Sequence, residues 1–338
     1  MINQTRKVPP MRTALAAALT ATALVAQPVF ASEGGISFWL PGNFGSLSAV
    51  PGAPGWSWAT VVIHTEVNSA AGAQFPRGGR LDLGISGTST PIIFGPTYTF
   101  VVPELNNAVV SFGVFGIGGR VDASVAASLT GPLGNTINLS RSQGLTSFGD
   151  VIPQVTVKWN QGVHNFMIYG TGDIPIGDYD PARIANLGIG HGAIDFGAGY
   201  TYFNPHTGWE FSGVGGLTYN FKNPDTQYQS GIDFHFDWGA SYFINHAIHL
   251  GLVGYYLQQI TDDFGAPPAL NGFRSRVAGV GPQVGILFPI AGMQGYVNVK
   301  GYQEFAAQNR PEGWNAWLTF GISPEPPNPA SKPITRKY

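Results

Sequence analysis

Apolar and polar side chains alternate along much of the chain. Residues 231–239 read Gly-Ile-Asp-Phe-His-Phe-Asp-Trp-Gly. In an extended strand, Asp233, His235 and Asp237 share one face, and large apolar side chains occupy the other. A soluble sheet would bury the apolar face in a core. In a transmembrane barrel that face meets lipid, and the polar face lines the lumen.

The same alternation recurs in 154–159, 194–202, 217–222, 297–300 and 315–322. One short alternation can arise by chance, but this many in one chain indicate an all-β protein. The candidate strands are 57–67, 80–87, 92–102, 107–117, 120–130, 151–160, 163–172, 190–203, 208–222, 230–243, 246–260, 273–288, 294–305 and 313–322. Many exceed the usual length of globular strands and suit tilted membrane strands. We therefore predict an antiparallel up-and-down transmembrane β-barrel over 57–322, with about twelve strands and fourteen as the alternative, since the number should be even.

The beginning of the chain has the pattern of an export signal. Arg6, Lys7 and Arg12 precede an apolar run over 13–26, and small residues lead to Ala31. The run is too short for a membrane-anchoring helix, which needs roughly 20 apolar residues. We predict a signal peptide over 1–31 and a location in the outer membrane of a Gram-negative bacterium. A soluble periplasmic β-protein is the alternative, and it would need a core for the apolar faces.

Composition narrows the classes further. Charged residues make up 11% of the chain and aromatic residues 13%, with 47 Gly and no Cys. This composition argues against a disordered chain and against a helical bundle. A formal net charge of −2 gives no basic surface, so we expect no nucleic-acid partner. The absence of Cys removes disulfides and thiolate chemistry, and no cofactor motif is visible, so we expect no cofactor.

Two flanking segments differ from the strands. Residues 36–56, within the N-terminal segment 32–56, contain three prolines and four glycines among apolar residues. Such a segment is not a membrane strand; it is either a short plug that enters the barrel or an extended periplasmic leader. Residues 323–338 are Pro-rich and predict a disordered tail.

The polar faces of the predicted strands give the candidate site. A lumen wall carries binding or selectivity groups in channels, and aromatic side chains on it can capture aromatic solutes. His235 between two aspartates could instead serve a lipase-like triad, although no serine is placed by the sequence. A plain hydrated wall is the third interpretation. The residues predicted to face the lumen are Lys158, Asp195, Asp233, His235, Asp237, Lys300 and Trp317.

Three further groups have open interpretations. Arg274 and Arg276 share a strand face and either oppose an acidic wall in the lumen or lie in an extramembrane loop. His246 and His249 fall on opposite strand faces, which disfavours a metal site, so we expect no metal there. The acidic residues at 173, 178 and 180 could bind Ca²⁺, but solvated turn residues are the simpler interpretation.

Short motifs give the chain a family resemblance. In order they are Glu33–Gly42, Phe148–Asp150, Gly172–Asp180, Asn186–Gly190, Asn223–Gly231, Gln258–Asp263, Gly279–Gln283 and Asn309–Gly313. Together they resemble the bacterial outer-membrane family named for the meta-pathway of phenol degradation. The resemblance implies an outer-membrane β-barrel that transports small hydrophobic or aromatic compounds, and it carries over no catalytic residue. One departure is the Pro-rich tail after Phe320, where barrels usually end on an aromatic strand residue read by the barrel assembly machinery.

These observations favour a passive outer-membrane channel that is not an enzyme. Its expected partners are outer-membrane lipid, a small hydrophobic or aromatic substrate and the barrel assembly machinery. The alternatives are an outer-membrane lipid hydrolase that uses His235, and a structural barrel whose outer loops carry the function.

Overall fold

A computed structural model describes residues 37–74, 80–130, 135–265 and 274–325. The predicted signal peptide lies outside the described residues, as do the beginning of the N-terminal segment and most of the predicted tail. Among the described residues, no helix has the length and apolar character needed to cross a membrane.

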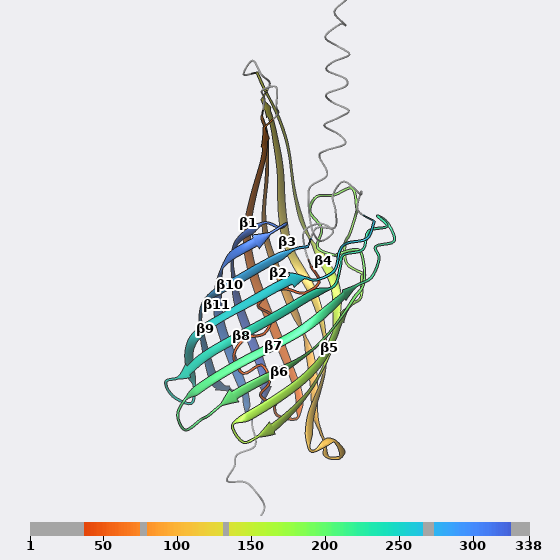
Figure 1. Ribbon diagram of the computed structural model, residues 1–338. Helices are drawn as coiled ribbons and strands as arrows, with labels where there is room; N and C mark the ends of the chain where they lie inside the picture. Colours follow the sequence, from red (N-terminus) through yellow and green to blue (C-terminus); the bar gives the residue numbers. More distant parts are fainter. Residues whose placement is uncertain (1–36, 75–79, 131–134, 266–273, 326–338) are drawn as a thin grey trace, which may run out of the picture.

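The described chain forms a closed barrel of twelve antiparallel strands, as predicted (Figure 1). Each strand pairs with its neighbours in sequence, and β1 closes on β12 in a register from Trp58↔Ile322 to Asn68↔Glu312. The elements are β1 (Gly55–Gln74), β2 (Arg80–Val102), the 3-10 turn η2 (Pro103–Leu105), β3 (Ala108–Thr130), β4 (Thr136–Gln161), β5 (His164–Asp173), β6 (Ala193–Phe203), β7 (Trp209–Asn220), β8 (Asp233–Phe243), β9 (Ile248–Gln259), β10 (Arg276–Ile290), β11 (Met293–Gln308) and β12 (Glu312–Pro324).

Two pairs of predicted strands are single long strands. The segments 80–87 and 92–102 form β2, and 107–117 and 120–130 form β3. Pro91 faces Gly119 across the β2–β3 pair, and Gly119 has a φ of +152°. A Cβ at Gly119 would lie 2.4 Å from the Thr90 carbonyl oxygen. Proline and glycine at this point mark a bend where the backbones approach closely, and the strands continue through it.

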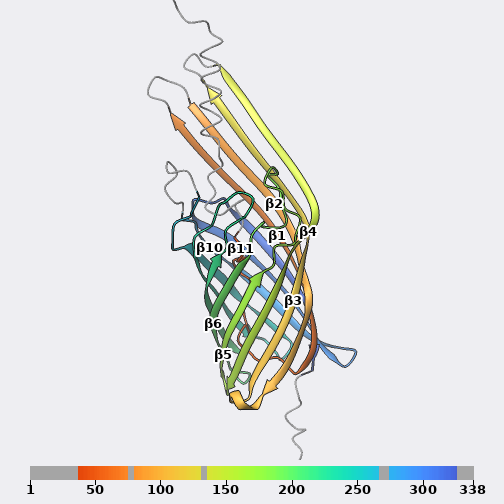
Figure 2. The same ribbon diagram turned by 90° about the vertical axis from the view of Figure 1, so that its right-hand side faces the viewer.

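Strands β1–β4 continue well beyond the rest of the barrel as a tall sheet (Figures 1 and 2). In β4 the residues 136–150 lie outside the predicted strands; they pair with β3, whereas the β4–β5 ladder begins only at Gln154↔Thr171. On the other side, β1 pairs with β2 beyond Asn68, where its ladder with β12 has ended. Within the described chain, the sheet therefore has free edges above the barrel.

The two faces of the barrel wall are inverted relative to a soluble protein. In β8, Asp233, His235 and Asp237 are at most 1% exposed, while Phe234 and Phe236 are 36% and 40% exposed. Phe196 and Leu217 on β6 and β7 also point outward, at 61% and 49%. Outward apolar side chains need a lipid environment, because no second layer of the described chain covers them. This arrangement excludes the soluble periplasmic alternative.

The two ends of the barrel differ in the length of their connections. Residues 162–163, 204–208, 244–247 and 291–292 form short turns at one end. Residues 174–192 and 221–232 form longer connections at the other end, where β9 also ends and β10 begins. Outer-membrane barrels have short periplasmic turns and longer extracellular loops. The tall β1–β4 sheet rises from the long-loop end, so this end faces outward from the cell.

Candidate functional site

The lumen contains a stretch of the chain itself. Residues 37–54, the lumen segment, run through the barrel interior before β1 begins at Gly55. Ser37 Oγ donates to Asp233 Oδ2 over 3.1 Å near the long-loop end. The Ala49 N–H donates to Thr201 Oγ1 over 3.0 Å near the short-turn end. The lumen segment therefore extends along the barrel from one end to the other.

Charged lumen groups hold this segment largely by its backbone. The Asp237 carboxylate accepts hydrogen bonds from the N–H groups of Gly42 and Phe44, each at 3.0 Å. Glu210 Oε1 accepts one from the Leu47 N–H at 2.8 Å. Backbone donors are present whatever the side chain, so these anchors depend on the path of the segment more than on its residues.

Four carboxylates line adjoining strands of the barrel. We call them the carboxylate wall: Asp195 on β6, Glu210 on β7, and Asp233 and Asp237 on β8. Each is at most 1% exposed. Glu210 is not among the predicted lumen residues, although it shares the inward face of the predicted strand 208–222.

Two lysines on other strands face the same interior. Lys300 on β11 donates from Nζ to the Gly42 carbonyl oxygen at 2.5 Å and stands 4.7 Å above the Trp317 ring. Lys158 on β4 donates to the Val50 carbonyl oxygen at 3.3 Å. Trp317 itself is 3% exposed. The lumen segment thus lies between acidic and basic groups that bind its N–H and C=O groups respectively.

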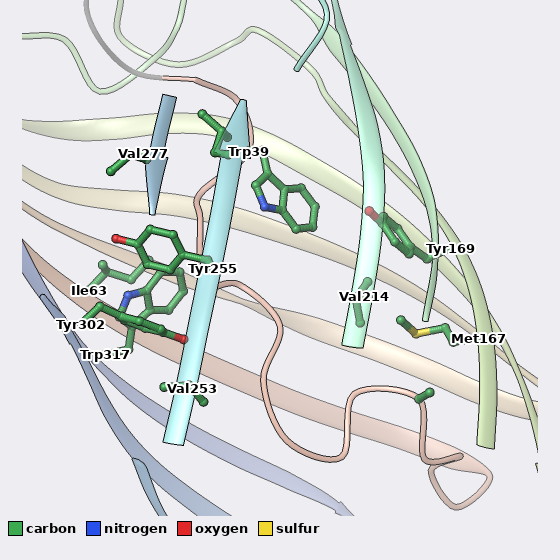
Figure 3. Packing of buried hydrophobic residues seen from close by; sticks show 12 residues of the cluster. Trp39, Ile63, Met167, Tyr169, Val214, Val253, Tyr255, Val277, Tyr302 and Trp317 are labelled. Carbon is green, nitrogen blue, oxygen red and sulfur yellow. The ribbon is translucent and has the colours of Figure 1, made fainter. Parts of the chain in front are cut away.

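His235 belongs to a polar and aromatic cluster in the wall. Its Nε2 lies 2.9 Å from Asp195 Oδ2, and Tyr169 donates to Asp195 Oδ1 over 2.8 Å. Gly216 makes room for both rings, because a Cβ there would lie 2.2 Å from Tyr169 Oη and 2.7 Å from His235 Nε2. Figure 3 shows Tyr169 beside Met167 and Val214 in the buried cluster.

The arrangement around His235 lacks the third member of a triad. Its Nδ1 is buried without a hydrogen-bond partner among the described residues, and its Nε2 contacts Asp195 and Tyr169. No serine hydroxyl bonds the imidazole in the part of the chain that the structure describes. The Asp–His pair therefore has the geometry of a wall group without an attached nucleophile.

The structure does not bring the two arginines into the lumen. Val277 is fully buried in the interior, so Arg276 next to it lies on the outward face of β10. Arg274 precedes β10, is exposed, and donates to Asp262 at 2.8 Å. The interpretation of a lumen pair is thus corrected: Arg276 shares its strand face with the outward side chains of Val280, Val284 and Ile286, whereas glycines and Gln283 occupy the inward face.

The predicted histidine and acidic groups also separate. His249 is buried and lies 3.0 Å from Tyr296 Oη, while His246 is exposed in a turn. Asp178 accepts a hydrogen bond from Arg183 Nη2 at 2.5 Å, and Asp180 Oδ2 lies 4.0 Å from Arg183 Nε. The Arg183 hydrogen bond lowers the pKa of Asp178. Asp178 and Asp180 therefore lie beside the Arg183 guanidinium, which belongs to the same loop.

Three of the short sequence motifs meet at the long-loop end. Asp150 accepts hydrogen bonds from the Gly177 N–H at 2.7 Å and the Ile189 N–H at 2.8 Å. A Cβ at Gly177 would lie 2.4 Å from the Gly149 carbonyl carbon. The motifs 148–150, 172–180 and 186–190 therefore form one packed unit that fixes the β5–β6 loop against β4. Sequence reasoning places these motifs in loops and misses this convergence.

A second carboxylate fixes the neighbouring loops. Asp263 accepts hydrogen bonds from the Gly231 N–H at 2.8 Å and from Gln259 Nε2 at 2.5 Å, and Tyr228 donates to its other oxygen. Burial raises the pKa of Asp263, and these hydrogen bonds act in the opposite direction. The motifs 223–231 and 258–263 are thereby joined beside the opening of the lumen.

An inverted, closed, antiparallel barrel with a polar lumen defines the class: an outer-membrane β-barrel protein. The chain belongs to the family described as "Putative MetA-pathway of phenol degradation", whose model matches residues 70–320. The resemblance carried by the short motifs is therefore confirmed. No curated protein matches the chain.

Two solved structures are similar to this chain. The COG4313 outer membrane channel from Pseudomonas putida F1 is 15% identical, with a TM-score of 0.61, over 84% of this chain and 99% of that one. A Pseudomonas aeruginosa FadL homologue is 8% identical, with a TM-score of 0.32, over 79% and 88% of the two chains. The first similarity supports the same barrel architecture at nearly full length.

Proposed function

We propose that this protein is a passive outer-membrane channel for small hydrophobic or aromatic compounds, and that the lumen segment is its plug. The observation that carries the proposal is a polar, aromatic-lined lumen filled by one non-strand stretch of chain. Hydrogen bonds hold that stretch to the wall, and it has no strand pairing that would fix it permanently. A plug of this kind can leave the lumen without breaking the barrel ladder.

The family and the Pseudomonas putida protein support this proposal. The family description refers to phenol degradation, and the Pseudomonas putida protein is named as an outer membrane channel. The lumen offers both polar groups and aromatic faces, as on Tyr169, Tyr255, Tyr302 and Trp317, which suits small molecules with an aromatic ring and a polar substituent. The chemistry we assign is thus passage and not catalysis, since His235 bonds no serine among the described residues.

Outer-membrane lipid and the barrel assembly machinery are the partners that we propose. The outward apolar belt includes Phe196, Phe236 and Leu318 and requires lipid contact. The last strand carries Phe320, and its pairing with β1 closes the barrel. Closure of this seam is the step that assembly machinery would assist.

Single-channel conductance in planar bilayers tests the proposal, together with phenol uptake by cells whose own outer membrane excludes it. We expect small, intermittent currents from the wild type and larger, steadier currents after deletion of residues 37–50. Uptake should rise with the protein present. Absence of current and of uptake in both forms would refute the channel. Equal currents in both forms would refute the plug alone.

A further inference from the structure

Trp39 of the lumen segment packs into a site on the barrel wall. We call this site, formed by His235, Tyr169 and Gly216, the seat of Trp39. The Trp39 ring is 2% exposed and stacks on the His235 ring, with centroids 3.6 Å apart and planes 14° from parallel. The Tyr169 ring lies 6.0 Å away. Figure 3 shows the indole directed from the segment into the buried cluster that contains Tyr169, Val214 and Met167.

The wall holds its side of this seat without help from the segment. Asp195 binds both His235 and Tyr169, and Thr218 Oγ1 donates to the same carboxylate at 2.5 Å. Gly216 leaves space for the two rings. These contacts join β5, β6, β7 and β8, so the seat should keep its shape when the segment moves.

The indole is held differently from the backbone around it. Ser37 and Gly42, on either side, hydrogen-bond to Asp233 and Asp237. Trp39 Nε1 is buried and has no hydrogen-bond partner among the described residues. Stacking and burial therefore retain the ring, and these are interactions that any planar aromatic molecule of similar size can supply.

We propose that the seat of Trp39 is an aromatic-binding subsite and that the indole is its internal competitor. A one- or two-ring aromatic molecule would stack on His235 beside Tyr169 after the Trp39 ring leaves. An aliphatic molecule of equal size would gain burial but not the stacking contact. This inference rests on the proposed function, because it gives the channel an aromatic-selective site on its path.

Calorimetric titration of indole into the detergent-purified full-length protein tests the subsite. Trp39→Ala should lower the Kd for indole at least about tenfold, because occupancy by a competitor reduces apparent affinity by the fraction of free sites. The matched control is Trp314→Ala, which removes an indole from the outward face, where Trp314 is 41% exposed. That control should bind indole as the wild type does. Cyclohexanol, which lacks a π system, should bind Trp39→Ala more weakly than phenol does.

A second variant separates the subsite from a simple cavity. Adding His235→Ala to Trp39→Ala enlarges the space but removes the stacking surface, so the gain in affinity should be lost. Heat-dependent gel migration checks that each variant forms the barrel. An unchanged Kd in Trp39→Ala, equal binding of cyclohexanol and phenol, or full affinity in the double variant would each overturn the proposal.

The subsite proposal and the channel proposal can fail independently of each other. Wild-type current and phenol uptake with an unchanged Kd in Trp39→Ala would remove the subsite and leave the channel. A tenfold lower Kd in that variant, with no current or uptake in any form, would retain the binding site and remove the channel.

Discussion

Asp237 is the strongest single anchor between the barrel wall and the lumen segment. Its two carboxylate oxygens accept hydrogen bonds from the Gly42 and Phe44 N–H groups, each at 3.0 Å. The side chain is 1% exposed. Asp237→Ala removes both acceptors at once and leaves the strand pairing of β8 unchanged, so the perturbation acts on the segment and not on the ladder.

The size of the effect follows from the number and kind of bonds. A hydrogen bond to a charged group contributes about 1.5 to 3 kcal/mol. Water that enters the lumen can solvate the freed N–H groups, so the low end applies and the two bonds together give about 3 kcal/mol. That is roughly a 150-fold shift toward the displaced segment. Asp237→Asn keeps one acceptor oxygen and should give about half of this energy, roughly a tenfold shift.

Single-channel recording measures the shift as the fraction of time spent in the high-conductance state. We expect that fraction to rise in the order wild type, Asp237→Asn, Asp237→Ala. The matched control is Asp82→Ala, which breaks an exposed ion pair with Arg80 at 2.7 Å on the tall sheet. The control should behave as the wild type. If Asp237→Ala forms a heat-modifiable barrel yet opens no more often than the wild type, the anchoring role is wrong.

Three further results are expected. Deletion of residues 37–50 should leave a cation-selective pore, because the four groups of the carboxylate wall outnumber the two lumen lysines. A reversal potential in a salt gradient that is zero, or has the sign expected for anion selectivity, would contradict this prediction. Phe196→Arg places a charge on the lipid face, where Phe196 is 61% exposed, and should lower the free energy of unfolding in vesicles by up to about 4 kcal/mol, the cost of an arginine at the bilayer midplane. A urea midpoint equal to that of the wild type would refute the outward assignment. Arg183 lowers the pKa of Asp178, so the contact is present above the ordinary carboxyl pKa and is lost as pH falls through the lowered value. The protection of residues 174–192 from hydrogen exchange, taken relative to the intrinsic rate at each pH, should therefore fall in acid in the wild type and show no such step in Asp178→Asn.

The two faces of the barrel wall could be read from the order of the residues. Side chains of a strand alternate between its faces, so the positions of Asp195, Asp237 and Phe236 along the chain were enough to predict their sides. The same alternation predicted an apolar outer surface, and the even strand number followed from the general architecture of bacterial outer-membrane barrels. It did less well in two places: Gly118 and Gly119 suggested a break where β3 continues, and two arginines at the start of β10 suggested a polar lumen face although Arg276 lies on the outward face.

The contacts inside the barrel could not be predicted from this alternation. Only the tertiary structure shows them. A hydrogen bond from the Gly42 N–H to Asp237 joins residues 195 positions apart, and neither residue signals the other in the sequence. The convergence of Gly177 and Ile189 on Asp150 is of the same kind. Local period fixes which way a side chain points, because it depends on one strand alone. What fills the lumen depends on how all twelve strands close, because closure alone brings distant backbone donors within reach of buried carboxylates.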